Sequence, residues 1–483
     1  MKSVSILTVG FIFLCSCNVY KEAAHPYSLA PATHDSNWTP PSKILQSVNK
    51  RQEAIPTPKI DSDRDYSMGE IIDLGLLYNT KTKESWSKAR AAAANYGKKL
   101  QDYFVLSQFD STYQRLKYPQ LDVNQTVSDF TTKFQNELNF SYTILDFGQT
   151  RFTSDAALYA LYEADWSHNH EIQFVMQELM NDYFNVVYQQ ELLIAYFADV
   201  EDAIITLDST EEKLRTGMSD ISDVLQARTY YLDTKLKVVN QQQKLNTAFA
   251  TLKNDMGISS NLKFTLQNFP TEYEYYEPKP FEQLMELAKK SRPDYLAALS
   301  DVESKEYALS AARSQYYPTV DGSFAIGNTQ GNNGLNDNYD FDVQVSLNLP
   351  LFQGFFQQNQ IKLTKANLST SQSKLLAIEL LMTKEISVYQ DDISFSLESI
   401  DYSTQYYETA QEDYKVNLDK YKQGTNNIVD VINALTAVAD ARAKEILAKK
   451  EYFQSLSNLA YALGSLNVNP HNLENLEQLD EEL

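Results

Sequence analysis

The side chains that could do chemistry are few, and their spacing does not suit catalysis. The chain has 483 residues but only 5 His and 2 Cys, too few soft ligands for a zinc or iron–sulfur centre. His168 and His170 stand two positions apart, so on a helix they point to different sides and do not make a metal pair. Acidic neighbours such as Asp391 and Asp392 are typical of a solvated helix face. We therefore expect no enzyme, no cofactor and no metal.

Charge and composition exclude two further classes of protein. Lys and Arg total 42 and Asp and Glu total 64, which leaves a net charge of −22. Phosphate backbones are bound by basic residues, so we expect no nucleic-acid partner. The hydrophobic content of 43% is enough for a packed core and argues against a disordered chain. The acidic end, residues 469–483, is predicted to be a solvated tail.

Both cysteines lie in an N-terminal export signal. Lys2 precedes an apolar run that ends at Leu14, as in a secretory signal peptide, and the run is too short to span a membrane stably. Leu14-Cys15-Ser16-Cys17 resembles the bacterial lipobox, in which the last Cys is lipidated and becomes the mature N-terminus. We expect a signal peptide at 1–16, lipidation of Cys17 and a Pro-rich tether at 17–65. The alternative is plain secretion with an incidental Cys.

Two long stretches without proline indicate long helices. No Pro lies between Pro119 and Pro270 or between Pro350 and Pro470, and Pro breaks helix interiors. The glycine-rich turns that a Rossmann or TIM-barrel enzyme needs every 20 to 30 residues or so are missing as well.

The two stretches are copies of one another. Gly217 and Gly424 lie 207 positions apart (424 − 217 = 207), and Gly257 and Gly464, Asp223 and Asp430, and Ala227 and Ala434 keep the same offset. Apolar residues recur at steps of three, four and seven, which predicts amphipathic helices. We therefore expect two repeats, 66–270 and 271–468. Each contains a long helical hairpin, at 148–257 and 354–464, with turns at Gly217 and Gly424 and C-caps at Gly257 and Gly464.

Each helical hairpin follows residues that alternate between apolar and polar. Alternation over 134–144 and 339–349 has the length of a membrane-crossing strand. Shorter alternating runs precede them, so we expect β-hairpins at about 119–146 and 318–350. The side chains predicted to face lipid are Phe140, Tyr142, Phe341, Val343, Val345 and Leu347. The alternative is a soluble sheet packed on the helices.

Four strands cannot close a barrel in lipid, because their edges would be unsatisfied. Two chains would give eight strands, whose interior is filled by side chains. Three chains would give twelve strands, the smallest symmetric closure expected to leave an open lumen. The strand count therefore predicts a homotrimer.

At this point the sequence resembles the TolC family of outer-membrane efflux proteins over nearly its whole mature length. The strand-to-helix signature of the family is matched by Pro350-Leu351-Phe352-Gln353-Gly354-Phe355 and by Leu145-Asp146-Phe147-Gly148 followed by Arg151. Its tip signature, a Gly followed six residues later by Asp and then by Val and Ala, occurs after Gly217 and after Gly424. The Cys17 region resembles the lipid-anchored branch.

The resemblance implies a mainly α fold with a small β part. It implies a TolC-like trimer in which a 12-stranded β-barrel, four strands from each chain, continues as an α-helical coiled-coil tunnel through the periplasm. The expected location is the bacterial outer membrane, with a lipid anchor. The expected function is the exit duct of a tripartite efflux system for small molecules such as drugs, toxic compounds or metal ions. The implied partners are a periplasmic adaptor (membrane fusion) protein and an inner-membrane transporter, RND-type rather than ABC-type.

Two other functions stay open at this stage. One is the outer-membrane conduit of a type I protein secretion system, which has the same fold. The other is a periplasmic coiled-coil scaffold, which would not enter the membrane fraction.

The resemblance also assigns roles near the tips of the helical hairpins. Asp430, Asn433 and Asp223 are expected at the periplasmic gate, and Gly217, Gly424, Thr216 and Thr425 at the adaptor-docking tips. The family often has a second Asp at the position of Asn433 and an Arg at that of Asn426, so this gate carries less charge. The alternative role for Asp223 and Asp430 is helix N-capping.

Overall fold

The computed structural model describes residues 58, 64–117, 130–270, 276, 278–331 and 338–466. These residues fall in one compact unit, Pro56–Leu483. The lipobox with Cys17, most of the tether, the acidic tail after residue 468 and the short alternating run at 121–127 lie outside the described residues.

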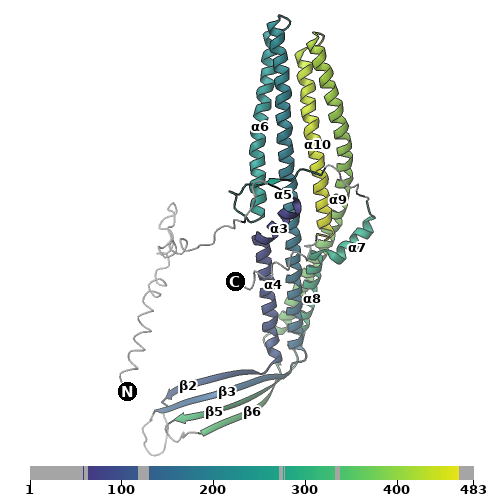
Figure 1. Ribbon diagram of the computed structural model, residues 1–483. Helices are drawn as coiled ribbons and strands as arrows, with labels where there is room; N and C mark the ends of the chain where they lie inside the picture. Colours follow the sequence, from purple (N-terminus) through teal and green to yellow (C-terminus); the bar gives the residue numbers. More distant parts are fainter. Residues whose placement is uncertain are drawn as a thin grey trace, which may run out of the picture. The chain divides into compact units, whose positions relative to one another are not determined.

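Two helical hairpins dominate the fold (Figure 1). The first pairs α5 (Gln149–Arg215) with α6 (Ile221–Asp255), and the second pairs α9 (Phe356–Lys422) with α10 (Ile428–Ala462). The two long helices have 67 residues each and the two returning helices 35 each, so they measure about 100 Å and about 50 Å. Every boundary in the second hairpin follows its counterpart by 207 residues. The predicted duplication and long helices are confirmed.

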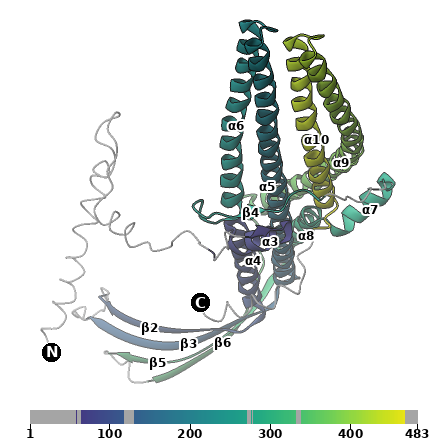
Figure 2. The same ribbon diagram turned by 45° about the horizontal axis from the view of Figure 1, so that its top comes forward.

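Shorter helices complete the two hairpins. α4 (Thr80–Lys99) packs along α5, and α8 (Pro293–Ser314) packs between α5 and α9. α3 (Met68–Tyr78) and α7 (Phe281–Ser291) pack against α5 and α9, respectively (Figure 2). The 3-10 turn η2 (Leu100–Tyr103) ends α4, and the small strands β1 (Asp65–Tyr66) and β4 (Thr265–Leu266) pair in parallel.

The sheet has four antiparallel strands in the order β2-β3-β5-β6. They are β2 (Leu106–Leu116), β3 (Thr131–Leu145), β5 (Thr319–Gly331) and β6 (Asn338–Asn348). Each has at least 11 residues, enough to cross the apolar core of a bilayer. Thus each repeat contributes one β-hairpin followed by one helical hairpin, as predicted.

The first β-hairpin begins earlier than the sequence predicted. Its first strand starts at Leu106, whereas the prediction placed the start near residue 119. The reason is the sparse pattern of β2, where only Phe109 and Tyr113 mark one face among polar residues. β2 is a strand because all of its residues pair with the 15-residue strand β3, and this pairing is not visible in the sequence pattern. The second hairpin, predicted at 318–350, spans Thr319–Asn348.

The core lies between the helices. One cluster, which includes Leu179, Val186, Leu252 and Met256, joins α5 and α6 to α3. Another, which includes Tyr421, Ile428 and Val431, fills the end of the second hairpin. None of the helices in the described part of the chain carries an apolar run that could span a bilayer.

Candidate functional site

The tips of the two hairpins are built by left-handed glycines. Gly217 has φ +75° and Gly424 has φ +78°, a conformation that strains residues with a Cβ. The N–H of Met218 donates to the carbonyl of Lys213 at 2.8 Å, and the N–H of Thr425 donates to the carbonyl of Lys420 at 2.9 Å. These bonds close each long helix in the same way.

The two predicted docking threonines turn their hydroxyl groups back onto their own helices. Thr216 Oγ1 donates to the carbonyls of Glu212 and Lys213, at 3.2 and 3.1 Å, and Thr425 Oγ1 donates to the carbonyl of Lys420 at 3.1 Å. Both hydroxyls therefore help to end the long helices. Met218 is the most exposed large apolar side chain of the first tip.

Asp223 links the first tip to the second hairpin. Its Oδ2 accepts hydrogen bonds from Ser219 Oγ at 2.6 Å and from the hydroxyl of Tyr421 on α9 at 3.4 Å. The N-cap position of α6 is Asp220. The capping role considered for Asp223 is therefore wrong, because its carboxylate is engaged by the turn and by α9.

A buried lysine strengthens the same link. Lys213 Nζ donates to the carbonyl of Tyr421 and lies 3.9 Å from the centroid of its ring. Both side chains are buried, and a buried cation is stable only with such partners. Burial, followed by the nearby carboxylate of Asp223, raises the pKa of Tyr421, so its hydroxyl stays a donor.

Sequence reasoning missed Lys213 and Tyr421. One signal was present, because the residue 207 positions before Tyr421 is Leu214. A tyrosine in one copy therefore stands where the other copy has leucine, next to a turn that the copies otherwise share. This difference between the two copies coincides with the contacts that Tyr421 makes to Lys213 and Asp223.

Asp430 lies in the first turn of α10. Its N–H donates to Asn427 Oδ1 at 2.9 Å, and Asn427 is the N-cap residue. The capping role considered for Asp430 is therefore also wrong. Asp430 is half-buried and Asn433 is exposed one turn further on. Asp430 and Asp223 lie in the first turns of α10 and α6, the counterpart helices of the two repeats, and their placement at a gate stays a prediction.

A second link between the hairpins lies deeper in the helices. Arg442 on α10 pairs with Asp199 on α5 and lies 3.8 Å from Asp202. It also donates to the carbonyl of Ala195 and to the hydroxyl of Tyr407, each at 3.2 Å. Burial raises the pKa of Asp199 to about 6, although the charge of Arg442 acts in the opposite direction.

This charged link was also missed from the sequence, although a signal for it exists. Arg442 lies four residues from both Val438 and Ile446, which are buried. A charged side chain inside an apolar helix stripe needs a partner. The sequence does not show which helix supplies it.

The sheet carries the predicted apolar face. Across the sheet, Phe140 lies opposite Phe324, which lies opposite Val343, and Tyr142 shares a row with Val345 through Gly322. Phe341, Val343, Val345 and Leu347 are largely exposed, and Phe140 and Tyr142 lie on the same face. The sheet extends away from the helices, which cover neither of its faces (Figure 1). The alternative of a sheet packed on the helices is therefore wrong.

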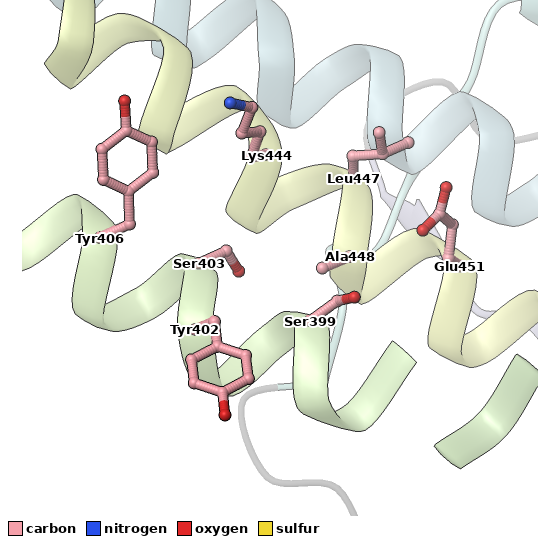
Figure 3. A pocket seen from close by; sticks show the side chains of 8 residues that line it. All are labelled: Ser399, Tyr402, Ser403, Tyr406, Lys444, Leu447, Ala448 and Glu451. Atoms are coloured by element: carbon pink, nitrogen blue, oxygen red, sulfur yellow. The ribbon is translucent and has the colours of Figure 1, made fainter. Parts of the chain in front are cut away.

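Grooves between the paired helices contain no catalytic constellation. The groove between α9 and α10 has a volume of about 420 Å³ and is lined by serines, tyrosines and an aliphatic stretch, with Lys444 and Glu451 at its margins (Figure 3). The groove between α5 and α6 is lined mainly by amide and hydroxyl side chains. The described residues include no cluster of three or more metal-binding side chains.

The two histidines diverge, as predicted. His168 Nδ1 lies 2.8 Å from Ser85 Oγ on α4. The ring of His170 lies 6.1 Å from that of Tyr461 on α10.

Comparison with known proteins gives consistent matches. The family model described as "Outer membrane efflux protein" matches residues 85–257 and 284–465. Outer membrane protein TolC of Escherichia coli is 25% identical over 320 residues, 63% of this chain and 64% of TolC. The match thus spans less than two thirds of that relative. Protein CyaE of Bordetella pertussis is 23% identical over 436 residues, 89% of each chain. The crystal structure of the outer membrane protein VceC from Vibrio cholerae superposes with a TM-score of 0.75 at 17% identity, over 82% of this chain and 96% of VceC.

Proposed function

The chain belongs to the outer membrane efflux protein family, and from that premise we propose that three copies form the outer-membrane exit duct of a tripartite efflux system. The duct would pass small molecules such as drugs, toxic compounds or metal ions from a periplasmic adaptor and an inner-membrane pump to the outside. We propose the division into repeats 66–270 and 271–468, with Cys17 as the lipid anchor.

The observation that carries this proposal is the sheet with two unpaired edges. Among the described residues, β2 and β6 each pair on one side only, and no labelled helix lies over either face of the sheet (Figure 1). Unpaired backbone groups are not tolerated in lipid. If β6 of one chain pairs with β2 of the next, three chains close a barrel of twelve strands.

The duplication supports the same ring for the helices. Within one chain, α10 packs on α5. The counterparts of this pair, 207 residues away, are α6 and α9, which form no comparable packing inside the chain. Exposed apolar residues lie on both helices, Leu236 and Val239 on α6 and Phe395 and Tyr402 on α9. We therefore place α6 of one protomer against α9 of the next.

The hairpin tips are then the periplasmic end of the duct. Three copies of Asp430 form one acidic ring, Asn433 adds polarity without charge, and Asp223 ties the first tip to α9. Six tips, at Gly217 and Gly424 with Thr216 and Thr425 beside them, face the adaptor. An RND-type transporter is the proposed pump, because the lipobox resembles that of the lipid-anchored branch.

Two experiments together test the proposed function: complementation of a strain that lacks the gene, and photo-crosslinking at the hairpin tip. Cells that lack the gene should accumulate a fluorescent dye substrate, and the intact gene should restore its export. A photo-crosslinking residue at Met218 should capture a periplasmic adaptor, whereas one at the exposed position Leu376 on the barrel-side half of α9 should not. Protein found only in the soluble periplasm, or export restored without any adaptor captured at Met218, would contradict the proposal.

A further inference from the structure

Each repeat contains a joint at which the end of one helix meets the start of another. In the first joint Asn79, the N-cap residue of α4, donates from Nδ2 to the carbonyl of Asp255, the last residue of α6, at 2.6 Å. In the second joint Arg292, the N-cap residue of α8, donates from Nη1 to the carbonyl of Ala462, the last residue of α10, at 3.3 Å. Asp255 and Ala462 are counterparts in the 207-residue repeat. Asn79 and Arg292 therefore occupy equivalent positions.

The second joint contains a buried cation with two carboxylate partners. The guanidinium of Arg292 pairs with Asp294 of α8 at 2.8 Å and with Glu385 of α9 at 2.5 Å, and its side chain is only 3% exposed. Four residues after Glu385, on the next turn of α9, stands the uncharged Tyr389. A charge in such a place is stable only when it is paired, and here each buried charge has its partner.

The first joint has two carboxyl groups where the second has uncharged side chains. The counterparts of Tyr389 and Ala462 are Asp182 on α5 and Asp255 on α6. The N-cap residue of this joint is an asparagine, so the cation of the second joint has no equivalent there. The first joint is therefore richer in acid and poorer in fixed positive charge than the second.

The remaining charged groups of the first joint are already paired with each other. Lys81 in the first turn of α4 forms an ion pair with Glu178 of α5 at 2.6 Å. Glu178 lies one turn before Asp182, and its charge also acts on Asp182. One ammonium group thus serves three carboxyl groups, those of Glu178, Asp182 and Asp255, whereas one guanidinium serves two carboxylates in the second joint.

Asp182 and Asp255 meet as a pair that lacks any other donor. The Oδ2 atom of Asp182 is buried and receives no hydrogen bond from an N–H or O–H group of the described residues. The carboxyl group of Asp255 lies within hydrogen-bonding reach, and two carboxyl groups can share a hydrogen bond only when one of them keeps its proton. Burial, followed by the neighbouring Asp255 and the charge of Glu178, raises the pKa of Asp182 to about 8.

We propose that Asp182 and Asp255 form a pH-dependent contact that holds the end of α6 against α5 while the two carboxyl groups share a proton. The proton takes the place of the positive charge that Arg292 supplies in the second joint. When it is lost, two adjacent carboxylates repel one another, and the last turns of α6 detach from α5. This contact lies within one chain, so it goes beyond the proposed duct and does not depend on it.

The direction of the pH dependence follows from the release of this proton. A carboxyl group in water has a pKa of about 4, so the closed joint binds a proton that the opened joint gives up. The stability of the joint should fall as pH rises from about 4 to about 8 and change little above that range. The second joint has no such pair, and the end of α10 should not respond to pH in this way.

Amide hydrogen exchange read by mass spectrometry tests the contact in the full-length protein. Protection is compared at pH 5.5 and pH 8 after correction for the chemical effect of pH on exchange. Peptides from residues 245–257, at the end of α6, should lose protection by about tenfold or more. Peptides from the equivalent residues 452–464, at the end of α10, should change less than about twofold and serve as the internal control.

Two substitutions assign the effect to the pair. Asp182→Asn keeps the shape of the protonated acid and should hold the protection of residues 245–257 constant over this range. Asp208→Asn, at an exposed position of the same helix, should behave as wild type. If Asp182→Asn does not fold, Asp255→Asn decides, because its amide can donate to Asp182 without a shared proton and should also suppress the loss.

Three results would overturn the proposal. The first is wild-type protection of residues 245–257 that does not change between pH 5.5 and pH 8. The second is an equal loss at residues 452–464, which would mean that pH acts on the whole protein. The third is a loss at residues 245–257 that persists in the folded Asn variants, which would place the titrating group elsewhere.

Discussion

At the scale of single residues, the contacts that matter most are polar groups that one hairpin presents to the other. Lys213, Asp223 and Tyr421 meet near the tips, and Arg442, Asp199 and Tyr407 meet further down. The sequence reasoning identified Asp223 because it repeats, but not its partners. A contact between two helices depends on their relative rotation, which a sequence pattern does not specify.

Replacing Tyr421 by phenylalanine should loosen the tips. The change removes the hydroxyl that donates to Asp223 and keeps the ring over Lys213, so the loss of stability should be about 0.5–1.5 kcal/mol. Single-channel recording in a planar bilayer should show a larger resting conductance. Tyr162→Phe, at an exposed tyrosine of α5 near the end of that helix opposite to the tip, is the matched control. Equal conductance in both variants would exclude the Asp223 bond as a restraint on the tips.

Replacing Asp430 by asparagine should weaken block by trivalent cations. Three carboxylates around one axis attract a multivalent cation applied from the periplasmic side. The wild-type channel should be blocked, and Asp430→Asn should lose most of that block. Asp419→Asn removes an exposed carboxylate of α9 near the same tip and should keep it. If Asp430→Asn is blocked as fully as wild type, the cation site lies elsewhere.

Replacing Arg442 by methionine should destabilise the protein more at pH 8 than at pH 5. Burial has raised the pKa of Asp199 to about 6, so the folded protein binds a proton that the unfolded chain does not, and stability falls as pH rises from about 4 to 6. Above that range the carboxylate needs Arg442, and its loss should cost about 3–5 kcal/mol. At pH 5 Asp199 is mostly neutral and the loss should be smaller.

Urea unfolding at the two pH values measures this difference. Lys444→Met, which removes an exposed cation two residues further along α10, should change stability little at either pH. An equal loss for Arg442→Met at pH 5 and pH 8 would mean that Asp199 stays charged in the folded protein throughout this range.

At the scale of elements, the sequence specified the helical hairpins closely and the first β-hairpin poorly. The helical boundaries follow from glycines that the 207-residue repeat marks twice, and the turns lie where predicted. β2 carries too few apolar residues for a period of two to be visible, so only its pairing with β3 reveals it. The strained turns at Phe147 and Phe355 were not predicted, because aromatic residues rarely adopt a left-handed backbone.

Bulky residues at the two tip glycines should abolish efflux without preventing assembly. Gly217→Leu and Gly424→Leu place a Cβ at φ +75° and +78°, at a cost of about 1–2 kcal/mol each. Apart from the adjoining residues, no atom of the described residues lies within 4 Å of a Cβ built at either glycine, so the strain should remain local to the tips. Gly97→Ala, which also has open space but an ordinary φ, is the control. Dye export at the wild-type rate from both tip variants would contradict a role for the tips in docking.

The two faces of β6 should differ sharply in their tolerance of charge. Val345→Arg puts a cation on the face proposed to contact lipid and should cost about 2–4 kcal/mol and hinder membrane insertion. Ser346→Arg lies on the opposite face, towards the proposed lumen, and should be tolerated. The amount of folded protein in the outer-membrane fraction measures the difference. Equal amounts would show that the alternation does not mark a barrel wall.

At the scale of the whole molecule, one chain is proposed to be a third of a closed duct. Within the described part of the chain, each edge strand of the sheet has one side without a pairing partner, and α6 and α9 carry exposed apolar residues. Both features point to neighbouring copies. The sequence predicted this assembly through the strand count. It did not predict which helices meet, because that follows from α10 packing on α5 inside the chain.

Crosslinking between neighbouring protomers in intact outer membranes tests whether three chains close the duct. Arg442 on α10 donates to the carbonyl of Ala195 on α5, and the counterparts of these residues are Lys235 on α6 and Tyr402 on α9. A chain with Lys235→Cys and Tyr402→Cys, treated with a short bis-maleimide, should migrate on a denaturing gel as a trimer, and either single variant should remain a monomer. Monomers alone from the double variant, or a ladder that extends beyond the trimer, would contradict a closed duct of three chains.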